Sequence, residues 1–92
     1  MDSTEEGILM LRLTQNKLEK QKIEIENEIA KSIRNAIQAK HANQKERIIQ
    51  YMKQKKRLTI LLTKRESFLH NITEILDKIE EAKSHKEVRN SE

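Results

Sequence analysis

The sequence predicts an all-α protein built as a long antiparallel helical hairpin, and three observations support this class. Charged residues make up 37% of the 92 residues and aromatic residues 2%, with one Gly and no Pro. A β-sheet needs closely spaced turn residues and aromatic side chains, which this chain lacks. Apolar residues recur at helical spacing in two long segments. A short polar segment separates the two.

The first helix is expected over about residues 4–40. Asp2, Ser3 and Thr4 can accept hydrogen bonds from free N–H groups, and Glu5 and Glu6 place carboxylates near the positive end of the helix dipole. Apolar residues then recur at intervals of three, four and seven, as on one face of an amphipathic helix. This first stripe comprises Ile8, Leu11, Leu18, Ile25, Ile29, Ile33 and Ala36.

The second helix is expected over about residues 44–87. Its apolar residues fill a, d and e positions of a heptad repeat, except where Arg65 takes an a position. This second stripe comprises Leu58, Leu61, Leu62, Phe68, Leu69, Ile72, Ile75, Leu76, Ile79 and Ala82. A helix with this pattern needs a partner along its length.

A chain reversal is expected at about residues 41–44. Residues 43–47 contain no apolar side chain, and Asn43 tolerates the left-handed conformation that ends helices. One continuous helix is the alternative, because an advance of about 100° per residue carries the first stripe into the second with a small drift. In the hairpin, we expect the core to contain Leu11, Leu18, Ile25, Ile29, Leu58, Leu62, Leu69, Ile72 and Leu76.

Seven apolar residues lie outside both stripes. Single exposed apolar side chains are common in proteins, which is the simplest interpretation. Together they could also form a second contact surface, and a chain this short buries little surface by itself. We therefore predict self-association into oligomers or filaments through Leu9, Met10, Leu13, Ile23, Ile37, Ile49 and Ile60.

Basic residues are concentrated in the middle of the chain, although the net charge is only +4. With about 100° per residue, five of them share roughly a third of the helix circumference. This basic strip comprises Lys45, Lys53, Lys56, Arg57 and Lys64. We predict that it binds an anionic membrane surface. A solvated helix face and docking on acidic residues of a neighbouring copy are the alternatives.

No pattern of catalytic, metal-binding or cofactor-binding residues is found. His41, His70 and His85 are far apart, and the chain contains no Cys and only one Gly. Zinc sites and phosphate-binding loops require clustered ligands or several glycines. No apolar segment is long enough to span a bilayer. We expect a protein that is not an enzyme and has no cofactor.

The residues on both sides of the turn resemble the first two helices of ESCRT-III proteins, the charged multivesicular body family. The matching residues are Ile8-x-x-Leu11-Arg12, Leu18-x-Lys20, Ile25, Ile29 and Ile33, followed by Ile48-x-x-Tyr51-Met52-Lys53-x-Lys55-Lys56-Arg57. The resemblance covers about residues 5–82. The family often has Gly-Asn-Lys in the turn, where this chain has Ala42-Asn43-Gln44. The end of the second helix resembles the member that acts at the nuclear envelope.

The resemblance implies a subunit that polymerises on membranes, with copies of itself and other ESCRT-III subunits as partners. It also implies a cytoplasmic, peripheral membrane location, at the endosome or the nuclear envelope, with Lys53, Lys56, Arg57 and Lys64 against lipid headgroups. Residues 1–92 would form one core fragment without the later helices of the family. The alternatives are a coiled-coil scaffold without a membrane role and a basic hairpin that binds nucleic acid. The chain lacks the aromatic side chains on which bases stack in many nucleic-acid-binding proteins.

Overall fold

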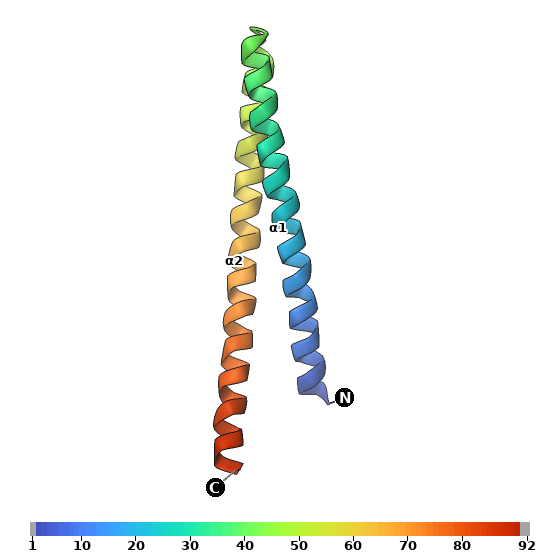
Figure 1. The fold of residues 1–92 in the computed structure, drawn as a ribbon, viewed down its shortest axis with the longest axis vertical. Coiled ribbons are helices and arrows are strands. Elements are labelled where there is room, and N and C mark those ends of the chain that lie inside the picture. Colours follow the sequence, from blue (N-terminus) through green and yellow to red (C-terminus); the bar gives the residue numbers. More distant parts are fainter. Residues whose placement is uncertain (1, 91–92) are drawn as a thin grey trace.

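The fold is a hairpin of two long antiparallel helices, α1 (Ser3–His41) and α2 (Lys45–Asn90), shown in Figure 1. The computed structural model describes residues 2–90, with side chains for residues 2–84. The molecule is a narrow rod with extents of 73 × 21 × 14 Å. The predicted hairpin is confirmed, and the alternative of one continuous helix is wrong. The side chain of His85 lies outside the described residues.

The first helix begins with an aspartate cap. The Asp2 carboxylate accepts a hydrogen bond of 2.8 Å from the backbone N–H of Glu5. Glu5 and Glu6 lie in the first turn, where carboxylates interact favourably with the helix dipole. Ser3 and Thr4 already belong to the helix, so α1 begins one residue earlier than predicted.

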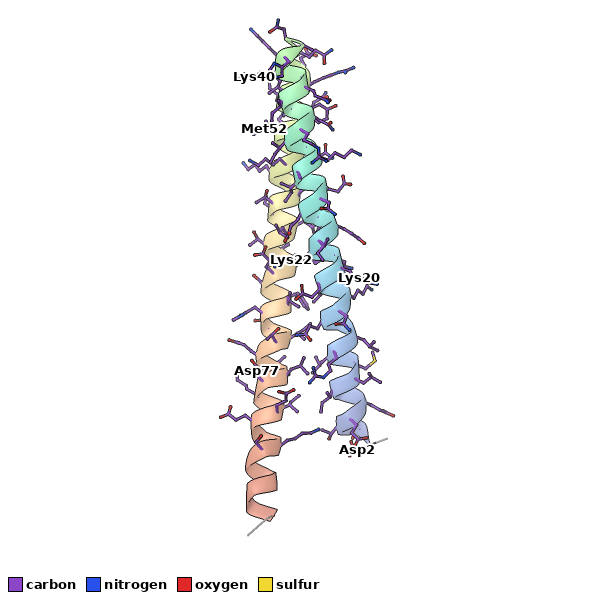
Figure 2. All side chains as sticks on the ribbon, in the orientation of Figure 1. Asp2, Lys20, Lys22, Lys40, Met52 and Asp77 are labelled. Carbon is purple, nitrogen blue, oxygen red and sulfur yellow. The ribbon has the colours of Figure 1, made fainter. Side chains whose placement is uncertain are left out.

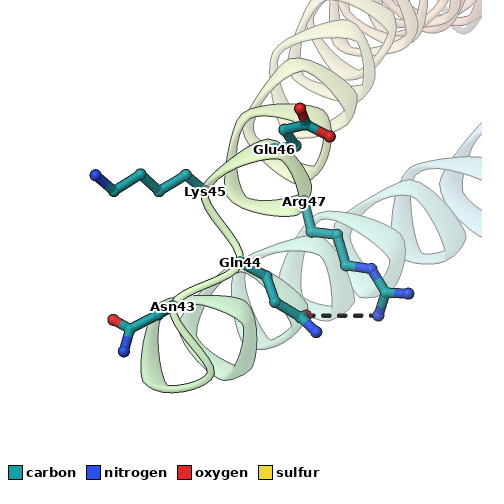
Figure 3. A pocket seen from close by; sticks show the side chains of 5 residues that line it. All are labelled: Asn43, Gln44, Lys45, Glu46 and Arg47. Carbon is teal, nitrogen blue, oxygen red and sulfur yellow. Dashed lines mark hydrogen bonds between the residues drawn. The ribbon is translucent and has the colours of Figure 1, made fainter.

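The chain reverses through three residues, Ala42, Asn43 and Gln44. Figure 3 shows Asn43 and Gln44 of this turn. Asn43 has a φ of 55°, and it alone among the described non-glycine residues has a positive φ. Its N–H donates to the carbonyl oxygen of Lys40 at 3.1 Å, and the N–H of Gln44 donates to that of Ala39 at 2.9 Å. This pair of bonds is the Schellman motif, in which a left-handed residue satisfies the last carbonyl groups of a helix.

The same turn also starts the second helix. The carbonyl oxygen of Gln44 accepts a hydrogen bond of 3.1 Å from the N–H of Ile48. The Gln44 side-chain oxygen accepts from Arg47 at 3.5 Å (Figure 3). Gln44 therefore ends one helix and begins the next, and the two helices are joined without a longer loop.

Small residues form the contact between the helices near the turn. Ser32, Ala36 and Ala39 are all buried there. Short side chains allow two helix axes to approach each other closely, because the distance between packed helices depends on the side chains at the contact. Figure 1 shows the two ribbons close together near the turn and farther apart toward the termini.

Large apolar residues fill the wider contact toward the termini. Leu18, Ile72 and Leu76 are buried in one cluster, against which Ile8, Leu11 and Leu69 pack. Ile25 is buried between this cluster and the small residues near the turn. The contact between the helices therefore changes from small to large side chains along the rod.

The structure places the nine residues expected in the core along this contact. Four of them, Leu18, Ile25, Ile72 and Leu76, are buried. The other five are half-buried: Leu11, Ile29, Leu58, Leu62 and Leu69.

Four members of the two stripes are exposed, contrary to the stripe pattern. They are Ile33, Phe68, Ile75 and Ala82, of which Phe68 is 63% exposed. A helix with a single partner covers only a narrow strip of its surface. With about 100° per residue, Phe68 projects about 80° away from the buried direction of α2.

Candidate functional site

The five residues of the basic strip all come from the first half of α2 and are all exposed. They are Lys45, Lys53, Lys56, Arg57 and Lys64. Because α2 is one uninterrupted helix, the angular positions of residues along it follow the regular helical advance. The centre of the strip lies about 160° from the direction of the buried and half-buried leucines and isoleucines of α2. The strip therefore faces away from α1.

The other cations of this region have different surroundings. Lys55 is half-buried and lines a groove between the helices with Ile33 and Ile37. Arg65 is half-buried near Leu18, and its Nε is buried without a hydrogen-bond partner among the described residues. Arg47 donates a hydrogen bond to the side-chain oxygen of Gln44 in the turn. None of these three belongs to the outward surface that the strip forms.

The seven apolar residues outside the stripes are all exposed in this structure. Five lie on α1 and two lie on α2. The three nearest the N-terminus of α1 are Leu9, Met10 and Leu13. Farther along α1 lie Ile23 and Ile37, and on α2 lie Ile49 and Ile60.

Met52 has no role predicted from the sequence, and it lies near the turn end of the rod, as Figure 2 shows. Its side chain is exposed and lines a groove between the helices. It also lines a shallow depression on α2 with Lys56 and Ile60. Its place beside Lys53 in the pattern Ile48-x-x-Tyr51-Met52-Lys53 was the only sequence signal that could have indicated it.

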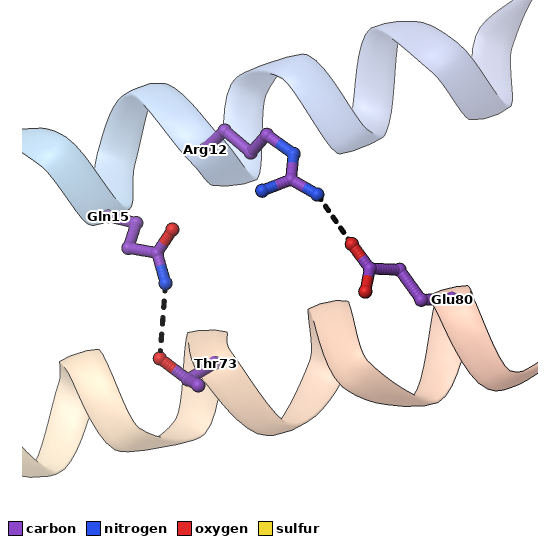
Figure 4. A network of polar contacts seen from close by, with 4 residues as sticks. All are labelled: Arg12, Gln15, Thr73 and Glu80. Carbon is purple, nitrogen blue, oxygen red and sulfur yellow. Dashed lines mark hydrogen bonds and ion pairs between the residues drawn. The ribbon is translucent and has the colours of Figure 1, made fainter.

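Polar contacts between the helices lie toward the open end of the hairpin, as Figure 4 shows. Arg12 Nη2 and Glu80 Oε1 form an ion pair at 2.6 Å. Gln15 Nε2 donates to Thr73 Oγ1 at 3.2 Å. Both partners of the ion pair are more than half exposed, so it stabilises the hairpin by less than about 1 kcal/mol. These contacts fix the alignment of the helices and do not form a reaction centre.

The described part of the chain offers no site for metal chemistry. Its His, Asp and Glu side chains form no group of three that could hold a metal ion. No helix searched within the described residues is long and apolar enough to cross a bilayer.

Comparison with known proteins identifies one family. The Snf7 family model matches residues 6–91. Neither a search of characterised proteins nor a search of solved structures finds a significant match. Snf7 proteins are the ESCRT-III proteins, structural and non-enzymatic proteins that form polymers with one another and act peripherally on membranes. Because the match covers nearly the whole chain, this protein belongs to the Snf7 family, the ESCRT-III proteins that remodel membranes.

Proposed function

We propose that this protein is a filament subunit that polymerises on anionic membranes and contributes to their constriction, scission or sealing. The observation that carries this proposal is the basic strip, whose five cations are exposed on the side of α2 that faces away from α1. Family membership supplies the general role in membrane remodelling. The strip supplies the surface that would bind the lipid.

The free energy with which one basic strip would bind an anionic bilayer is small, so tight membrane binding would require polymerisation. A Lys or Arg near an anionic bilayer contributes about 1 kcal/mol, so the five cations of the strip supply about 5 kcal/mol. A free energy of this size corresponds to a dissociation constant of about 0.2 mM. One subunit would therefore bind weakly and reversibly. An array of linked subunits would bind far more tightly, because each further contact is intramolecular.

Contacts between subunits would use exposed apolar side chains of α1. Leu9, Met10 and Leu13 lie near its N-terminus, and Ile23 and Ile37 lie farther along the same helix. Their burial between neighbouring hairpins would supply a driving force that salt does not screen. The neighbours would be copies of this chain or other ESCRT-III subunits, on the endosome or the nuclear envelope.

Vesicle co-sedimentation with a charge-reversed variant tests the strip. In this variant Lys53, Lys56, Arg57 and Lys64 are replaced by Glu. The wild type is expected to sediment with phosphatidylserine-containing vesicles and not with neutral ones, and salt is expected to weaken this binding. The variant is expected to remain in the supernatant with unchanged helicity.

A matched control separates the position of the charges from the net charge. Replacing Lys17, Lys20, Lys31 and Arg34 by Glu reverses four exposed cations of α1 and gives the same net charge. This control is expected to keep most of the vesicle binding. Equal loss in both variants would show that only the overall charge matters and would refute the strip assignment.

Electron microscopy of the protein on the same vesicles tests polymerisation. Ordered coats or filaments on anionic membranes are the expected result. A discrete dimer or trimer that ignores lipid would instead identify a coiled-coil scaffold. Duplex DNA binding that falls steeply with salt, without vesicle binding, would identify a nucleic-acid-binding hairpin.

A further inference from the structure

Two isoleucines lie between the cations on the outward face of α2. With the four lysines of the strip they form a line spaced by four, four, three, four and four positions, which stays within an arc of about 100°. All six side chains are exposed. We call this line the lysine–isoleucine stripe, and its members are Lys45, Ile49, Lys53, Lys56, Ile60 and Lys64.

The position of the stripe excludes a contact with α1. The stripe lies on the opposite side of α2 from Leu58, Leu62 and Leu69, which face α1. Ile49 is 54% exposed and Ile60 is 51% exposed, although both are among the most apolar side chains of the protein. The hairpin by itself therefore leaves both residues without a partner.

The surroundings of Ile60 are cationic. Ile60 lines a shallow depression together with Met52, Lys55, Lys56 and Thr59, and no carboxylate lines it. Two copies that met through this face would bring their lysines together and repel each other. The charge is complementary to an anionic surface.

The stripe has a defined length. It spans about 28 Å at 1.5 Å per residue, from the turn to Lys64. The next three positions on the same line are Ser67, Asn71 and Glu74, which are polar or acidic. The alternation of lysine and isoleucine along this line is therefore interrupted after Lys64.

We propose that Ile49 and Ile60 are membrane anchors that insert into the headgroup layer of an anionic bilayer, rather than contacts between copies of the chain. This inference rests on the proposed function. Cations on either side hold the helix at the lipid surface, and the isoleucines between them become buried among the acyl chains nearest the headgroups. Apolar burial is not screened by salt, so the two residues supply the part of the binding that remains at high ionic strength.

The first test replaces the two anchors. The variant Ile49→Gln/Ile60→Gln is expected to bind phosphatidylserine-containing vesicles about tenfold more weakly than the wild type, a loss of about 1.4 kcal/mol. It is also expected to lose the binding that survives salt screening. The control Ile33→Gln/Phe68→Gln changes two exposed apolar side chains, 38% and 63% exposed, that belong neither to the lysine–isoleucine stripe nor to the proposed contacts between subunits. Measured at concentrations where the protein is monomeric, this control is expected to bind as the wild type does.

The second test reads insertion directly. The chain contains no Trp, so Ile60→Trp introduces a single fluorescent reporter. Its emission is expected to shift to shorter wavelength on vesicles and to be quenched by lipids with brominated acyl chains. The reporter Phe68→Trp, at a 63% exposed position of α2 outside the lysine–isoleucine stripe, is expected to escape this quenching.

The outcomes distinguish this inference from the proposed function. In one outcome, the two Gln substitutions leave vesicle binding unchanged while charge reversal of the basic strip removes it. That result would refute the insertion of Ile49 and Ile60 and would support lipid binding by the basic strip. If the Trp at position 60 shifts with protein concentration without lipid, the residue belongs to a contact between copies and the inference is refuted. If the wild type binds no anionic vesicles, both proposals fail.

Discussion

Truncation of Leu76 tests the contact between the helices at the residue where the structure gives the clearest magnitude. Leu76 is 5% exposed and packs with Leu18 and Ile72. Leu76→Ala removes three carbons, each worth about 0.8 kcal/mol when buried. The narrow rod can relax around the missing atoms, so the cavity adds little and we expect a loss of about 2–3 kcal/mol in the free energy of unfolding. For a chain of this size, the melting temperature falls by about 10–20 °C.

Thermal unfolding followed by circular dichroism measures this loss, in dilute protein without lipid so that self-association does not contribute. Phe68→Ala is the matched control, because it removes a larger side chain that is 63% exposed. We expect it to change the free energy of unfolding by less than about 1 kcal/mol. Equal destabilisation by the two substitutions would show that Phe68 belongs to the contact and would refute the placement of α2 against α1.

The remaining predictions concern the turn and the two ends of the contact, measured by the same unfolding experiment. Asn43→Gly is expected to preserve or raise stability, and Asn43→Val to lower it by about 1–2 kcal/mol, because its φ is positive; equal stability of the two variants would contradict the left-handed turn. Ala39→Leu is expected to cost about 1–3 kcal/mol through overpacking, whereas no loss would mean that the helices are farther apart there. Glu80→Gln removes the charge that pairs with Arg12 and is expected to cost less than about 1 kcal/mol, with a smaller effect in high salt.

The helices and the turn could be predicted because their signals are local in the sequence. A cap such as Asp2 and a left-handed residue such as Asn43 act on hydrogen bonds within a few residues. The predicted bounds of α1 differ from the observed ones by one residue at each end. Helical spacing also indicated the direction in which residues such as Leu18 and Ile72 would point.

The details of packing could not be predicted because they depend on the distance between the helices. Ser32 and Ala39 are buried near the turn although neither belongs to an apolar stripe. Phe68 and Ile75 belong to a stripe and remain exposed, because one partner helix covers less of the surface than the stripe occupies. The periodic pattern does not predict how wide a strip of α2 the partner helix covers. That width is set only when α1 and α2 pack together.

For the surfaces proposed for function, the sequence likewise defines some features and the packing of the helices decides others. The positions of Lys53 and Ile60 on one face of α2 follow from the regular advance of a helix, which the sequence alone defines. Whether that face would be covered depended on how the chain reverses at Asn43 and which side of α2 meets α1. The tertiary structure decided this, because the same periodic sequence is compatible with a straight helix. Only the packed hairpin buries one side of α2 and leaves the lysine–isoleucine stripe exposed on the other.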